Sequence, residues 1–149
     1  MSTQWKFFKK FEIPDAVDRT CIYLRRWNLI VTPWFSIKVH NIRLPDGDRA
    51  LHDHPWRFTS IILKGGYTEE LPLDPAQSYG PWNTEFIRRR RFSRHTVQAA
   101  GLHRIHWVDP DTWTLVFTRG HERVWGFSPD AGQWISWYEF LGVDAASDD

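Results

Sequence analysis

The chain has 149 residues, 42% of them hydrophobic and 25% charged, which is typical of a single globular domain and excludes a disordered chain. Its 19 basic and 18 acidic residues leave a formal net charge of +1, so nucleic acid is not an expected partner. A single cysteine, Cys21, excludes an internal disulfide and any zinc site made from several cysteines.

The sequence predicts a cytoplasmic protein. Its uninterrupted apolar runs are only a few residues long, too short to cross a membrane. The N-terminal residues also lack the apolar stretch of a signal peptide. Two counts stand out, ten tryptophans and seven histidines, because aromatic side chains favour strands and pockets and histidines are common metal ligands.

Short runs of strand-forming residues between Gly and Pro predict an all-β domain, a sandwich or a barrel, over residues 1–149. Residues 1–14 are expected to form an N-terminal extension and residues 144–149 a frayed tail. Asp15 could cap a short helix over residues 15–26, although residues 22–30 could equally form a strand. Further strands are expected over residues 35–40, 57–63, 85–93, 103–108 and 113–118, a surface loop over residues 71–83, and shorter elements over residues 123–127 and 134–141.

His52 and His54 form the sharpest local feature. Separated by one residue on an extended segment, they point to the same side and could share a metal ion at roughly 2.0–2.2 Å from each ring nitrogen. His103, on a later strand, is the expected third ligand. His95 is a rival ligand if the turn after Gln98 shifts the register, whereas His106 has the opposite parity to His103 and is expected to face away.

Two stretches resemble the conserved motifs of the cupin superfamily. Residues 47–66 resemble the first motif, a glycine followed by His-x-His, a glutamate four or five residues later and another glycine. Residues 94–105 resemble the second motif, in which His103 takes the place of a metal-binding histidine. A looser pattern is similar to small cupin-like proteins of bacteria and phages, and consists of Trp34-Phe35, His52-Asp53-His54-Pro55-Trp56, Gly65-Gly66-Tyr67 and Trp125-Gly126-Phe127.

The chain departs from the cupin pattern at the glutamate. The positions four and five residues after His54 hold Phe58 and Thr59, and neither supplies a carboxylate. The resemblance therefore implies a cupin-type β-barrel, also called a double-stranded β-helix or jelly roll, with a metal site of His52, His54 and His103. Similar three-histidine sites occur in the thiol dioxygenase branch, so Fe(II) is favoured, with Mn, Ni or Zn as other candidates. The missing glutamate also allows that metal affinity is low or lost.

The expected function is a metal-dependent oxygenase that acts on a small molecule. A metal-dependent isomerase or lyase is one alternative, because a Lewis-acidic ion could polarise a substrate without dioxygen. A non-catalytic cupin module that binds a small ligand or a protein is the other alternative. Exposed strand edges could also pair two copies of the chain into a homodimer.

Aromatic and basic residues near the histidines predict a substrate pocket. Trp56 and Phe58 share the parity of the His52–His54 pair, and Trp107 shares that of His103, so these side chains are expected to line the cavity, although tryptophans in a small barrel often only fill space. Arg89 and Arg90 lie in the basic run 88–91, where alternate side chains face opposite sides, so one of them is expected to anchor a carboxylate or phosphate. Further candidate anchors are Arg57, Arg104 and Arg123.

Overall fold

The computed structural model of the chain describes residues 6–15, 18–46 and 50–144, and it is built almost entirely of antiparallel strands. Strands account for 54% of the described residues and helix for 4%, so the expected all-β fold is confirmed. Within the described residues no helix is long and apolar enough to cross a membrane.

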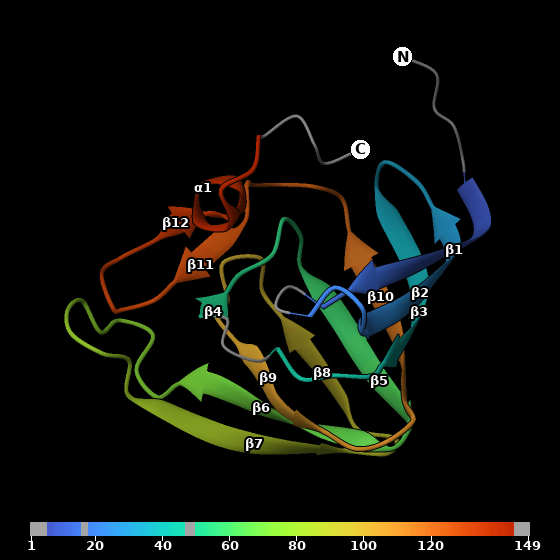
Figure 1. The fold of residues 1–149 in the computed structure, drawn as a ribbon, viewed down its shortest axis with the longest axis horizontal. Coiled ribbons are helices and arrows are strands. Elements are labelled where there is room, and N and C mark those ends of the chain that lie inside the picture. Colours follow the sequence, from blue (N-terminus) through green and yellow to red (C-terminus); the bar gives the residue numbers. More distant parts are fainter. Residues whose placement is uncertain (1–5, 16–17, 47–49, 145–149) are drawn as a thin grey trace.

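Two walls of strands face each other (Figure 1). The larger wall is a six-stranded sheet whose strands pair in the order β1 (Lys6–Pro14), β2 (Ile22–Val31), β3 (Phe35–Ile42), β10 (Thr112–Arg119), β5 (Phe58–Lys64) and β8 (Arg94–Val97). The other wall combines two three-stranded sheets, which are β7 (Thr84–Arg90), β6 (Gly66–Pro72) and β9 (Arg104–Val108), and β12 (Ile135–Ser136), β11 (Gly126–Ser128) and β4 (Leu51–His52). One short helix, α1 (Trp137–Leu141), follows β12.

Two connections hold the three sheets together. An antiparallel bridge between His52 and His103 joins the two smaller sheets, with both backbone N–H···O distances at 3.0 Å. Gly65 carries the chain from β5 in the large sheet to β6 in the opposite wall, and its φ of +72° is favourable only for glycine. A Cβ at this position would lie 2.4 Å from Thr112 Oγ1, so the turn needs a residue without a side chain.

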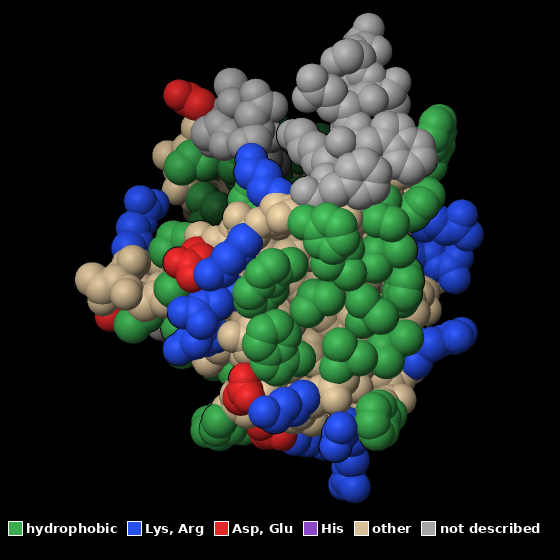
Figure 2. All heavy atoms as spheres, turned by 90° about the vertical axis from the view of Figure 1, so that its right-hand side faces the viewer, with side chains coloured by type: hydrophobic (Ala, Val, Ile, Leu, Met, Phe, Trp, Pro, Cys, Tyr) green, Lys and Arg blue, Asp and Glu red, His purple; other side chains and the backbone are tan. Residues whose placement is uncertain are grey.

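The apolar core occupies only part of the interior. It consists of buried side chains from both walls, namely Leu24, Ile42, Ile62, Tyr67 and Val108. Elsewhere the strands of the large sheet turn polar side chains inward, as burial alternates along β3 and β10. Their apolar side chains face outward and form a broad apolar surface over this sheet (Figure 2), whose most exposed members include Phe35 and Phe117.

The short helix expected over residues 15–26 is wrong for the part that the structure describes. Residues 19–20 form a turn in which Asp18 accepts hydrogen bonds from the backbone and hydroxyl of Thr20. From Ile22 onward the chain is strand β2, which is paired on both sides, with β1 and with β3. This tertiary pairing outweighs a local helix cap. Of the expected frayed tail, residues 145–149 lie outside the described residues.

Candidate metal centre

The three predicted ligands meet at one point inside the barrel. Each of His52, His54 and His103 offers a ring nitrogen, and these nitrogens all lie within 4.8 Å of one another. The β4–β9 bridge sets this arrangement, because directly opposed residues of an antiparallel pair project their side chains to the same face. His54 follows two residues later on that face, and its Nε2 lies 2.6 Å from Nε2 of His103.

Glu69 on β6 supports this cluster from behind. Its side chain has no exposed surface, and its Oε1 lies 2.5 Å from Nδ1 of His103. Burial alone would raise the pKa of Glu69, but the hydrogen bond and positive charge of His103, together with His95 and Arg89, bring that pKa down to about 2. The ionised carboxylate therefore holds the proton of His103 on Nδ1 and leaves the lone pair on Nε2.

The donor set fits a divalent metal ion. Burial, followed by the positive charges of His103 and His52, lowers the pKa of His54 well below 6.5, so its imidazole is neutral at pH 7. Two imidazole Nε2 atoms 2.6 Å apart need a proton or a cation between them. The carboxylate of Glu69 hydrogen-bonds a ligand on its far nitrogen, which is the usual way that proteins orient a metal-binding histidine.

His95, the rival ligand, is not part of the cluster. Its Nε2 lies 3.1 Å from the hydroxyl of Tyr67 and 3.7 Å from Oε2 of Glu69, which places it behind the carboxylate rather than beside the other imidazoles. Arg89 also belongs to this group, because its Nε donates to Oε2 of Glu69 at 2.8 Å. Arg89 therefore neutralises a buried acid, and Arg90 next to it is exposed.

Phe58 lies beside the histidines, as its parity predicts, whereas the contacts of Trp56 are with Lys38 and His121. The ring of Phe58 packs edge-on against His54, with centroids 4.8 Å apart, and lies 5.9 Å from His103. Trp56 lies against the ammonium group of Lys38, which faces inward from β3. Sequence reasoning missed two further neighbours, since Phe127 and Trp125 approach His52 with ring centroids at 5.9 and 6.4 Å.

Trp107 does not line the cavity, contrary to the expectation from its parity. It is 60% exposed and pairs with Thr68 on β6. The register between β6 and β9 shifts at this point, because Ile105 pairs with Glu69 while Trp107 pairs with Thr68. The extra residue, His106, forms a bulge that reverses the alternation after it. His106 itself is exposed and packs on Phe86, as its opposite parity suggests.

Two candidate arginine anchors are engaged by acids. Arg123 pairs with Asp53, whose buried carboxylate also accepts hydrogen bonds from the backbone of Gly126 at 2.7 Å and from Nε1 of Trp134 at 2.9 Å. Arg104 pairs with Glu70. Asp53 thus fixes the segment that carries β11 beside the His52–His54 pair.

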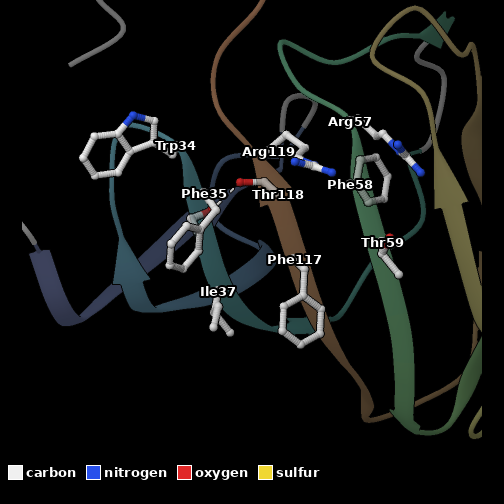
Figure 3. A pocket seen from close by; sticks show the side chains of 10 residues that line it. Trp34, Phe35, Ile37, Arg57, Phe58, Thr59, Phe117, Thr118 and Arg119 are labelled. Atoms are coloured by element: carbon white, nitrogen blue, oxygen red, sulfur yellow. Dashed lines mark hydrogen bonds between the residues drawn. The ribbon is translucent and has the colours of Figure 1, made fainter.

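Arg57 lies at a different opening. A surface groove runs across the rim of the large sheet, where β3 and β5 begin and β10 ends (Figure 3). Aromatic and apolar side chains form one part of it, and Arg57 and Arg119 lie together at the other. Arg57 is exposed there, so it does not form a wall of the histidine cluster.

Comparisons with known proteins give a likeness of structure alone. No family model and no curated protein matches the sequence. KdgF from Halomonas sp. aligns with a TM-score of 0.53 at 12% identity, over 78% of this chain and 96% of its own. Fe(II)-HppE with an alternative substrate aligns with a TM-score of 0.52 at 13% identity, over 74% of this chain and 56% of its own. The nucleoside dehydratase Pac13 of Streptomyces aligns with a TM-score of 0.51 at 11% identity, over 82% of this chain and 86% of its own.

Proposed function

This chain has the cupin fold, and we propose that it is a metal-dependent enzyme that acts on a small molecule. The observation that carries the proposal is the convergence of His52, His54 and His103, whose ligand nitrogens lie within 4.8 Å of one another. A set of three neutral imidazoles leaves coordination positions open, as catalytic rather than structural sites do.

An Fe(II) oxygenase is the specific activity that we propose. Ferrous iron, when bound by three neutral nitrogen ligands, supplies open positions for dioxygen and substrate together. Two features support this choice, namely the three-histidine set, which is similar to that of the thiol dioxygenase branch of the cupins, and the likeness in fold to Fe(II)-HppE.

The protein's own groups have distinct tasks in this site. Glu69 keeps the proton of His103 on Nδ1, so that Nε2 stays available as a ligand. Phe58, Trp125 and Phe127 cover the imidazoles with apolar rings and keep bulk water from the cluster. Trp56, two residues from His54 along the chain, offers an aromatic ring on which an unsaturated or planar part of a substrate can stack.

Metal analysis of matched variants tests the proposal. Protein purified without chelator or affinity tag is expected to contain about one metal ion per chain. The exchange His103→Ala is expected to bring this ratio close to zero, whereas His106→Ala, on the exposed bulge of the same strand, leaves it unchanged. With iron loaded anaerobically, nitric oxide as a stand-in for dioxygen is expected to give the electron paramagnetic resonance signal of an Fe–NO complex.

The other outcomes separate the alternatives. A chain that binds only zinc, manganese or nickel, and whose iron form gives no nitric oxide signal, would point to isomerase or lyase chemistry. Failure to bind Fe(II), Mn(II), Ni(II) or Zn(II) at all would leave a non-catalytic binding module.

A further inference from the structure

The inner face of the large sheet opposite the histidines carries a row of polar side chains. They come from three adjacent strands, and cross-strand pairing places Asn28 beside Lys38 and His40 beside Thr114. Arg26 pairs with His40 from the other side. We call the set of Asn28, Lys38, His40 and Thr114 the polar wall. In a barrel that served only as a scaffold, these inward positions would carry apolar residues.

Lys38 is the exceptional member of this wall. It is 6% exposed, and it is the one lysine or arginine classed as buried in the described part of the chain. The partly buried arginines of the other wall each pair with a buried acid, as Arg89 does with Glu69 and Arg123 with Asp53. No carboxylate of the described residues lies within 4.0 Å of the Lys38 ammonium, whose contact is the ring of Trp56 at 4.3 Å. A buried charge without a counter-charge is costly, and a bound anion removes that cost.

The neighbours of Lys38 also lack hydrogen-bond partners. Asn28 Oδ1, His40 Nε2 and Thr114 Oγ1 are buried and make no hydrogen bond within the described residues. Leaving such a group unpaired costs about 1–3 kcal/mol, so buried polar atoms of this kind normally meet a water or a ligand. The hydroxyl of Thr114 and the neutral imidazole of His40 can each donate a hydrogen bond to an oxygen atom, whereas the unpaired Oδ1 of Asn28 is an acceptor that suits a hydroxyl or water bound beside that oxygen.

The polar wall faces the metal centre. Trp56, whose ring covers Lys38, is two residues from His54 on the same segment. Phe58, which packs on His54, pairs with Thr118 on β10, and Thr118 is buried on the same face of that strand as Thr114. The polar wall and the three histidines therefore both face the interior between the two walls of strands.

We infer that the polar wall binds the anionic oxygen group, a carboxylate or a phosphate, of a small-molecule substrate, with Lys38 as its counter-charge. This inference rests on the proposed function, because the histidine cluster is what makes the bound molecule a substrate. It deepens that function by naming the substrate class, an oxyanion-bearing small molecule whose other end meets the metal.

Calorimetric titration of inorganic phosphate and of acetate tests the inference. Both are titrated at constant ionic strength into the full-length chain, in its metal-loaded and its chelator-treated forms. We expect saturable binding of at least one probe in both forms, and the tighter probe identifies the group as phosphate or carboxylate. The exchange Lys38→Met is expected to weaken this binding at least ten-fold. Lys64→Met is the matched control, because Lys64 is exposed and pairs with Asp111 at 2.5 Å, and it leaves the affinity unchanged.

Two results of the titrations would overturn the inference. One is that neither phosphate nor acetate binds saturably, and the other is that Lys38→Met and Lys64→Met lose affinity equally. If Lys38→Met does not fold, Thr114→Val decides, because it keeps the shape of the wall and removes one donor. It is expected to weaken binding several-fold, and wild-type affinity overturns the inference. Metal content is measured on the same samples, so that a failure of the oxyanion inference can be distinguished from a failure of the proposed metal-dependent function. A chain that binds metal and no probe refutes only the inference, and one that binds a probe and no metal refutes only the proposed function.

Discussion

At the scale of single residues, Glu69 joins His103 of the histidine cluster to Arg89 of the same wall and lies near His95 of the large sheet. Its two oxygens contact His103 and Arg89, while His95 lies 3.7 Å away. A fully buried carboxylate is tolerated here because three potential donors surround it. Phe58 and Thr59 thus occupy the positions where cupin motifs place a glutamate ligand. Glu69 is a different acid, which contacts the far ring nitrogen of His103.

Replacing Glu69 with Gln is expected to weaken metal binding by about 10–100-fold, the usual effect of removing a group that orients a ligand. Gln keeps the size of the side chain but loses the charge that makes His103 a better donor. The dissociation constant is measured by competition with a coloured chelator.

Glu70→Gln is the matched control for this prediction. Glu70 is the adjacent buried acid, and its contacts are Thr84 at 2.9 Å and Arg104. Its exchange should leave the metal affinity unaltered. A Glu69→Gln variant with wild-type affinity, or equal effects in the two variants, would show that Glu69 does not support the ligand.

The sequence alone was enough to predict that the three histidines come together, but not that Glu69 lies behind them. His52 and His54 share a face through strand parity, and the cupin resemblance supplied His103. Glu69 lies fifteen residues after His54 and beyond the Gly65 turn, so no spacing rule links the two. Its position depends on the pairing of β6 with β9, a contact between segments distant in the sequence.

At the scale of elements, the turn at Gly65 controls how one wall leads to the other. Gly65 and Gly80 have nearly the same left-handed backbone, with φ of +72° and +75°. Only Gly65 is crowded, because an added Cβ would lie 2.4 Å from Thr112 Oγ1, whereas nothing lies within 4 Å at Gly80. Alanine at either position would suffer the same backbone strain, but only alanine at position 65 would also overlap a neighbouring side chain.

Gly65→Ala is expected to lower the free energy of unfolding by about 1–3 kcal/mol more than Gly80→Ala does, the usual cost of overpacking. Both variants share the cost of forcing Ala into the left-handed region, roughly 1–2 kcal/mol. Urea unfolding of the two variants measures the difference. Equal losses would mean that Thr112 moves aside freely and that the turn tolerates a side chain.

The positions of strands were predictable where apolar and polar residues alternate clearly. Which face of each strand points to the interior was not predictable. Residues 35–40 and 113–118 alternate clearly and form β3 and β10. Alternation shows that a strand has two faces but does not say which face is inside, and here the apolar faces point outward. Trp107 was misplaced for a related reason, because a one-residue bulge leaves no trace in the pattern before it.

At the scale of the whole molecule, a buried lysine makes stability depend on pH. Burial, and then the positive charge of Arg26, lowers the pKa of Lys38 from its ordinary 10.5 to about 7. Between about pH 7 and 10.5 the unfolded chain holds a proton that the folded chain has lost. The contribution of Lys38 to the free energy of unfolding therefore rises with pH across this window.

The expected result is that wild type gains stability relative to Lys38→Met between pH 7 and pH 9, as measured by urea unfolding in the absence of binding anions. The charged or titratable neighbours do not interfere, because Arg26 stays protonated and both His40 and His54 have pKa values well below 6.5. A stability difference that stays constant over this range would contradict the prediction.

The homodimer expected from strand edges stays a prediction, which light scattering of the purified chain tests.

The position of the apolar core relative to the histidines also affects how the molecule moves. Along β5, Phe58 contacts His54, whereas Ile62, four residues later, belongs to the core. Local opening costs least where few apolar contacts must break. We expect an ion or a small molecule to reach the histidines through local movement of the covering rings of Phe58, Trp125 and Phe127, while the layer around Ile62 stays closed. The backbone amide of His54, which donates to the carbonyl oxygen of Ala99 at 3.0 Å, is therefore expected to exchange its hydrogen through local opening, and that of Ile62 only through opening of the core.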